Sequence, residues 1–109
     1  MQNTKGTGPV ANYIAAANTR DIEAVMAIFS DCAVVRDEGH SWQGIAAIRQ
    51  WAVDVSTKYH PIVETLDVAE ADGRTILMGR VAGSFPGSPV DLRYAFTLKR
   101  GKIEHLEIS

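Results

Sequence analysis

The first half of the chain carries hydrophobic residues at helical spacing, in three separate runs. Gly8-Pro9 opens the first run, since proline is tolerated in the first turn of a helix. Asp21 is a good N-cap for the second run. The third, at about residues 45–58, ends before Pro61 because the residue preceding a proline avoids helical geometry. The pattern predicts three amphipathic helices. Their apolar faces comprise Val10, Tyr13, Ile14 and Ala17; Ile22, Val25, Met26 and Phe29; and Ile45, Ile48, Trp51, Ala52 and Val55.

Alternating hydrophobic and polar residues predict strands in the rest of the chain. One strand is expected at about residues 33–38, followed by a turn at Gly39-His40-Ser41 and a short extended Trp42-Gln43. Four more are expected at about 62–71, 75–85, 90–100 and 103–109, with Asp72-Gly73 as a hairpin turn. No helix separates these four strands, which favours a largely antiparallel sheet and an α+β fold. Three helices on one face of a curved sheet would leave a conical cavity between the layers.

Asp37 is the candidate for chemistry, because it interrupts an apolar strand. Ala33, Val35 and Asp37 fall on one face of that strand. If this face lines a cavity, burial raises the pKa of the carboxyl and makes it a candidate proton shuttle. The alternative is that Asp37 ends the strand at a solvated rim. Tyr13 and Tyr94 also lie on apolar faces, where their hydroxyls need partners; the alternative for them is a core position bonded to the backbone.

Composition narrows the possible partners. The chain has 109 residues, enough for one domain at 1–109, of which residues 1–7 are expected to form a frayed tail. A net charge of -2 indicates no nucleic-acid partner. One cysteine, Cys32, excludes an internal disulfide, and no apolar run is long enough to span a bilayer, so a cytoplasmic protein is expected. The histidines lack metal-ligand spacing and no cofactor motif occurs, so neither a metal nor a cofactor is expected.

Three further residues or strands lead to expectations. The strand at about 75–85 is apolar on both faces, which suggests a homodimer formed through the outer face of the sheet. Arg80 on that strand is expected to pair with a neighbouring acid. His105 shares a predicted strand face with Ile103 and Glu107, so it could reach the cavity and act as an acid or base.

The chain resembles the nuclear transport factor 2-like superfamily, and within it the SnoaL-like and steroid Δ-isomerase-like members. The resemblance is carried by residues 13–18, by Asp21 with residues 27–31, by residues 33–37 and by residues 44–49. It implies a cone of three helices on a strongly curved, mixed and largely antiparallel sheet, with a ligand pocket inside and usually a dimeric assembly. It also places a catalytic base at Asp37 and an oxyanion donor at Tyr13. The second donor falls at Tyr94, where the isomerases have an aspartate, and Glu38 stands where they have a proline.

These features predict a protein that binds a small apolar molecule, with the activity of a cofactor-independent isomerase or cyclase. Asp37 would move a proton next to a carbonyl while Tyr13 and Tyr94 hold the oxyanion. The expected substrate-binding residues are Phe29, Trp42, Trp51, Phe96 and His105. Two alternatives stay open: a non-catalytic ligand-binding or dimeric interaction module, and a dehydratase-like enzyme that uses His105 with Asp37.

Overall fold

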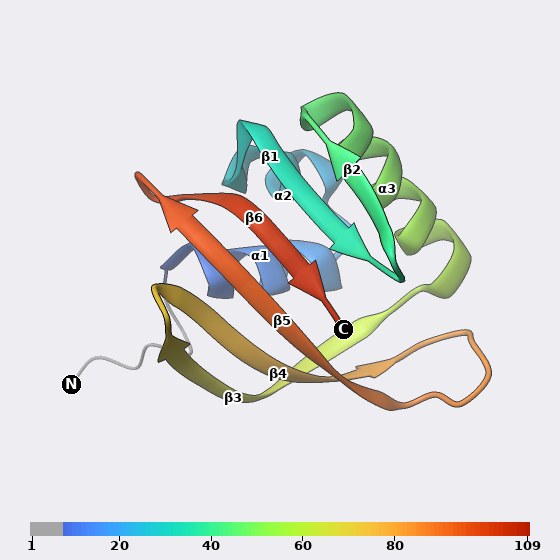
Figure 1. Cartoon of the computed structure of the whole chain (residues 1–109). Coiled ribbons are helices and arrows are strands. Elements are labelled where there is room, and N and C mark those ends of the chain that lie inside the picture. The colour runs from blue at the N-terminus through green and yellow to red at the C-terminus, as the bar shows by residue number, and fades with distance from the viewer. Residues whose placement is uncertain (1–7) are drawn as a thin grey trace.

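A computed structural model describes residues 8–109, and the expected tail at residues 1–7 lies outside that part. Along the chain, two helices are followed by a β-hairpin, a third helix and then four strands (Figure 1). The helices are α1 (Gly8–Asn18), α2 (Ile22–Ile28) and α3 (Ile45–Tyr59). The strands are β1 (Phe29–Asp37), β2 (His40–Gln43), β3 (Ile62–Ala71), β4 (Arg74–Ala82), β5 (Val90–Lys99) and β6 (Lys102–Ile108).

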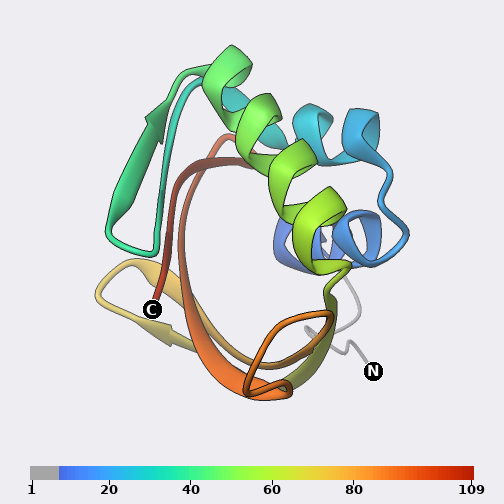
Figure 2. The ribbon, with the colours of Figure 1, turned by 90° about the vertical axis from the view of Figure 1, so that its right-hand side faces the viewer.

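The six strands form one mixed sheet in the order β2-β1-β6-β5-β4-β3. All neighbours are antiparallel except β1 and β6, which run parallel. The sheet curves strongly without closing, and the three helices cover its concave face (Figure 2). The α+β cone expected from the sequence is confirmed.

The core lies between the helices and the concave face of the sheet. Its large side chains with almost no exposed surface come from β1, β4, β5, β6 and α3: Phe29, Val35, Leu77, Phe96, Ile103, Leu106 and Ile48. Asn18, at the end of α1, ties this helix to the sheet. Its side-chain amide donates to the Val63 carbonyl at 2.9 Å and accepts from the Val63 N–H at 2.8 Å. One side chain thereby satisfies both backbone groups of a residue in the edge strand β3.

The turn of the β1–β2 hairpin lies directly after Asp37, and not at Gly39-His40-Ser41 as expected. The two turn residues are Glu38 and Gly39, with φ of 54° and 78°, so the second strand begins at His40. Two consecutive positive φ values are typical of a tight turn whose twist suits a hairpin. The prediction failed because glutamate rarely adopts positive φ, so its position did not signal the turn.

Two other boundaries also differ. Phe29, expected on the apolar stripe of the second helix, is the first residue of β1, because α2 ends at Ile28. Residues 83–85, expected to continue a strand, lie beyond the end of β4 at Ala82. The expected ion pair of Arg80 is confirmed: its Nε lies 3.1 Å from Oδ1 of Asp91, with both side chains about half exposed on the outer face.

Candidate active site

Asp37 and Tyr94 lie in one row across the concave face of the sheet. Asp37 pairs with Ile108 of β6, and Tyr94 of β5 pairs with the same Ile108 on its other side. Residues in register on neighbouring strands point to the same face, so both side chains project inward. Two strand spacings separate their backbones, about 10 Å, a gap that a tyrosine side chain can partly cross.

Tyr13 reaches this row from α1 on the opposite layer. Its ring packs edge-on against Phe29 at 5.9 Å and against Phe96 at 5.7 Å between ring centroids. Phe96 also stacks on Tyr94, with centroids 6.2 Å apart and an interplanar angle of 10°. Both phenols therefore pack against one buried phenylalanine, and their ring positions are set by core packing.

A glycine makes room for the Tyr94 ring. Gly79 of β4 faces inward, and a Cβ placed there would lie 2.8 Å from Val63 Cγ1 and 3.4 Å from Tyr94 Cε1. The first distance is shorter than van der Waals contact allows. A side chain at this position would therefore force the Val63 side chain to shift and would crowd the Tyr94 ring.

The Asp37 carboxyl is half-buried and has one hydrogen-bond donor from α3. The indole Nε1 of Trp51 donates to its Oδ2 at 3.1 Å. Burial raises the pKa of Asp37, and the charge of Glu38 adds to that effect, while the hydrogen bonds from Trp51 and the Glu38 backbone lower it. Burial is the largest of these causes, so the carboxyl is a stronger base than one in water.

Both tyrosines stay protonated at neutral pH. Burial is the main cause that raises the pKa of Tyr13, and the charges of Tyr94 and Asp37 raise it further. Burial and the charge of Asp37 likewise raise the pKa of Tyr94. Within residues 8–109 neither hydroxyl forms a hydrogen bond, so each O–H is available as a donor to another group.

A small hollow lies on the helical side of this cluster. It measures about 40 Å³ and is lined by Tyr13, Trp51 and residues of all three helices. That volume holds a water molecule and is far below the volume of a typical ligand pocket. A second hollow, of about 600 Å³, lies elsewhere, between α1 and the β3–β4 hairpin.

Comparison with known proteins gives the family. The SnoaL-like domain family matches residues 10–105, most of the chain. The chain belongs to the SnoaL-like family. No curated protein matches it. It is similar to the crystal structure of a candidate polyketide cyclase from Sinorhizobium meliloti, with 38% identity, a TM-score of 0.89 and 93% of each chain covered.

More distant structures share the fold of this SnoaL-like domain. A candidate polyketide cyclase from Xanthomonas campestris has 20% identity and a TM-score of 0.81, over 96% of this chain and 89% of the other. A protein with a ketosteroid isomerase-like fold from Catenulispora acidiphila, in complex with trimethylamine, has 15% identity and a TM-score of 0.81, over 94% and 86%. These likenesses show a common fold, and the family match over residues 10–105 confirms the superfamily expected from the sequence.

The expected aromatic residues of the SnoaL-like domain fall into two groups. Phe29 and Phe96 are buried, and each packs against Tyr13. Trp42 pairs with Val35 across the hairpin and lies 6.2 Å from Trp51 between ring centroids. Phe29 and Phe96 therefore pack against Tyr13, while Trp42 lies next to Trp51, which donates a hydrogen bond to Asp37.

His105 lies on the outer face of the sheet, so the expectation that it reaches the cavity is wrong. It is in register with Val34 on one side and Thr97 on the other, and both belong to the face opposite the core. A register irregularity between Ile103 and His105 lets both Ile103 and Leu106 point inward. Strict alternation fails at such a bulge, which moved His105 away from Asp37.

His40 is the residue near the cluster that sequence reasoning missed. It pairs directly with Asp37 across the hairpin, on the same face, and its ring lies 6.1 Å from that of Trp42. The correct turn at Glu38-Gly39 would have revealed this pairing. Within residues 8–109 no three histidine, cysteine, aspartate or glutamate side chains come close enough to hold a metal ion.

Proposed function

We propose that this SnoaL-like domain is a cofactor-independent isomerase or cyclase acting on a small, mostly apolar carbonyl compound. The observation that supports this proposal best is that Asp37 and Tyr94 lie in one row of the sheet, while Tyr13 reaches from α1 to the same Phe96 that packs against Tyr94. The name of the 38% identical Sinorhizobium meliloti protein, a candidate polyketide cyclase, supports the same reaction class.

The proposed reaction begins with proton removal by Asp37. Its carboxylate takes a proton from the carbon next to the carbonyl, and the C–H electron pair forms an enolate with its charge on oxygen. Tyr13 and Tyr94 donate hydrogen bonds to that oxygen, where preorganised donors are most effective. Protonated Asp37 then returns the proton to another carbon for isomerisation. For cyclisation, the enolate carbon attacks a second carbonyl of the same molecule, and Asp37 gives its proton to the alkoxide that forms.

The exposed part of the Asp37 carboxyl indicates where the substrate enters. Asp37 is the last residue of β1, and Ile108, the residue between it and Tyr94, is also only partly buried. The Asp37 end of this row therefore reaches solvent, while Tyr94 at its other end is buried. Trp51 holds Oδ2 from the helical side, and we place the substrate at the other carboxylate oxygen, Oδ1.

Solvent-deuterium exchange at carbon tests this proposal without knowledge of the natural substrate. 2-Tetralone and 2-indanone carry acidic protons next to a carbonyl, and their exchange in D2O is followed by proton NMR. We expect the wild-type protein to accelerate exchange and Asp37→Asn to abolish the acceleration. Tyr13→Phe and Tyr94→Phe each remove one oxyanion donor and should lower kcat by about 10² to 10³ with little change in KM.

Tyr59→Phe is the matched control, because Tyr59 ends α3 and packs against Phe85, outside the cluster. It should exchange protons like the wild type. Equal rates in Asp37→Asn and wild type would overturn the mechanism. No acceleration of either ketone would favour a non-catalytic ligand-binding module. The dehydratase alternative with His105 has no support, because His105 lies on the other side of the sheet.

We further propose a homodimer through the outer face of the sheet. Ile62 is 46% exposed there, and Ile76, Met78 and Ala82 share this face. Sedimentation at micromolar concentration tests the proposal: a dimer that Met78→Glu converts to a monomer supports it, and a wild-type monomer contradicts it. Among residues 8–109 no helix is both long and apolar enough to cross a bilayer.

A further inference from the structure

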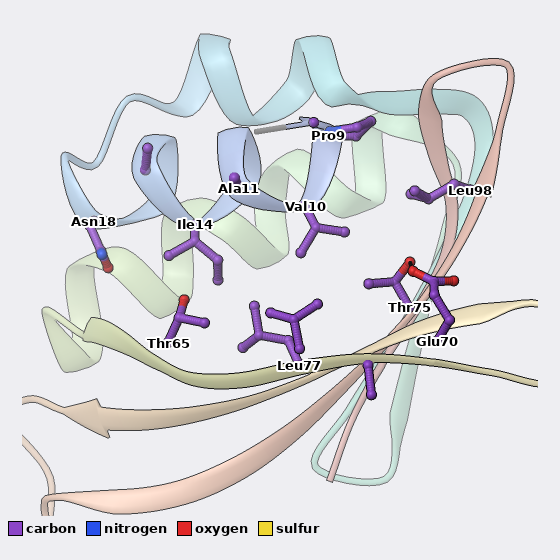
Figure 3. Close-up of a pocket in the computed structure, with 14 residues that line it drawn as sticks. Pro9, Val10, Ala11, Ile14, Asn18, Thr65, Glu70, Thr75, Leu77 and Leu98 are labelled. Carbon is purple, nitrogen blue, oxygen red and sulfur yellow. Dashed lines mark hydrogen bonds between the residues drawn. The ribbon is translucent and has the colours of Figure 1, made fainter. Parts of the chain in front are cut away.

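The groove between α1 and the β3–β4 hairpin is separate from the Asp37 cluster. Its volume is about 600 Å³, within the usual range for small-molecule sites. It is lined by α1, β3, β4 and Leu98 of β5, and by neither Asp37 nor Tyr94 (Figure 3). A ligand bound here would therefore leave the proposed base uncovered.

The middle of the groove is apolar. Val10 and Ile14 project from α1 toward Leu77 of β4, and Leu98 closes one side (Figure 3). These side chains belong to α1, β4 and β5, so the packing of the helix on the sheet fixes the walls of the groove. This surface suits a hydrocarbon chain or ring.

One end of the groove carries a carboxylate that the fold holds in place. Oε2 of Glu70 accepts a hydrogen bond of 2.8 Å from Oγ1 of Thr75 across the hairpin. Thr75 is only 8% exposed, so its hydroxyl fixes the direction of the glutamate side chain from inside the groove. Among the lining residues that the structure describes, Glu70 is the only charged one.

An apolar groove with a single carboxylate at its end is complementary to one class of ligand. We propose that the groove binds an amphipathic monocation, a primary amine with a hydrocarbon body. The ammonium group contacts Glu70 and the hydrocarbon body lies between α1 and Leu77. An alcohol of the same length lacks the charge, and a carboxylic acid is repelled by Glu70.

Calorimetric titration with octylamine, octanol and octanoate tests this site at a constant chain length. Octylamine should bind most tightly and octanoate most weakly. Glu70→Gln should weaken octylamine binding three- to fivefold, since Glu70 is exposed and such ion pairs are modest, and should leave octanol unchanged. Glu64→Gln is the matched control. Glu64 lies on the same strand, but it is in register with Arg80 and so faces the outer side of the sheet.

A blocking variant and an active-site variant separate this proposal from the proposed function. Ala15 is an exposed residue that lines the groove, so Ala15→Trp should obstruct part of it and weaken binding of all three probes without unfolding the domain. Asp37→Asn should bind octylamine like the wild type. The inference is wrong if octylamine binds no better than octanol, if Ala15→Trp binds it unchanged, or if Asp37→Asn loses it.

Discussion

Replacing Asp37 by asparagine should stabilise the fold while it removes the proposed base. The asparagine Oδ1 can still accept the hydrogen bond that Trp51 donates to the carboxyl. What disappears is the charge, whose burial is the main cause that raises the pKa of Asp37. We therefore expect Asp37→Asn to increase the free energy of unfolding at pH 7.

The size of the effect follows from the surroundings of the carboxyl. Leaving a buried polar group poorly solvated costs about 1 to 3 kcal/mol. Asp37 is only partly buried and keeps one hydrogen bond, so the lower end applies. A gain of about 1 kcal/mol corresponds to a rise of about 4 °C in Tm for a domain of this size.

The pH dependence distinguishes this cause from a simple packing effect. The pKa of Asp37 is higher in the folded chain than the value of about 3.9 expected in the unfolded chain. The folded state therefore binds more protons, and wild-type stability falls as pH rises through this window. Below a pH of about 3.9 the carboxyl is mostly neutral in both states, so the advantage of Asp37→Asn should largely disappear there.

Urea unfolding of both proteins at pH 7 and near pH 3.5 measures this difference. Asp31→Asn is the control, because Asp31 lies on the same strand and is exposed, and it should change stability by less than about 0.5 kcal/mol. A variant Asp37→Asn that is less stable than wild type at pH 7, or whose advantage is the same at both pH values, would refute the reasoning.

Two other substitutions test contacts that hold the site. Trp51→Phe removes the indole N–H that donates to Asp37, so the pKa of Asp37 should rise. The acid limb of the pH–rate profile for deuterium exchange should therefore move to higher pH. An unchanged limb would contradict the contact. Asn18→Ala leaves the N–H and C=O of Val63 without their side-chain partner and should cost about 2 to 3 kcal/mol in urea unfolding. A loss below about 0.5 kcal/mol would show that water replaces the amide.

Local patterns in the sequence are sufficient to predict which side of a helix or strand is buried, but not which strands pair with each other. Helical and alternating periods put Tyr13 and Tyr94 on apolar faces, and both are 5% exposed in the structure. The proximity of Tyr94 and Asp37 depends on β6 lying between their strands, with β1 parallel to it. That pairing joins residues about 70 positions apart. The family resemblance, rather than any period, carried this long-range information.

The errors share one physical cause, which is backbone geometry that side-chain type does not reveal. Glu38 adopts positive φ in a turn, although glutamate has no preference for it, and this shifted the start of β2 to His40. An irregular register beside β6 sent His105 to the outer face. At the bulge in β6 a shift of one residue exchanges the faces of the strand, and in the hairpin the earlier turn brings His40 opposite Asp37.

Helix α1 connects the two proposed sites, because adjacent residues on it face different ones. Successive residues of a helix are rotated by about 100°, so Tyr13 points to Phe29 and Phe96 while Ile14 lines the groove. The amide of Asn18 holds the end of the same helix to β3, which forms the other wall of the groove. A ligand in the groove would pack against the helix that positions the Tyr13 hydroxyl. Coupling between amine binding and proton transfer therefore has two routes: the placement of α1, and Leu77, which lines the groove and is in register with Tyr94 on the neighbouring strand.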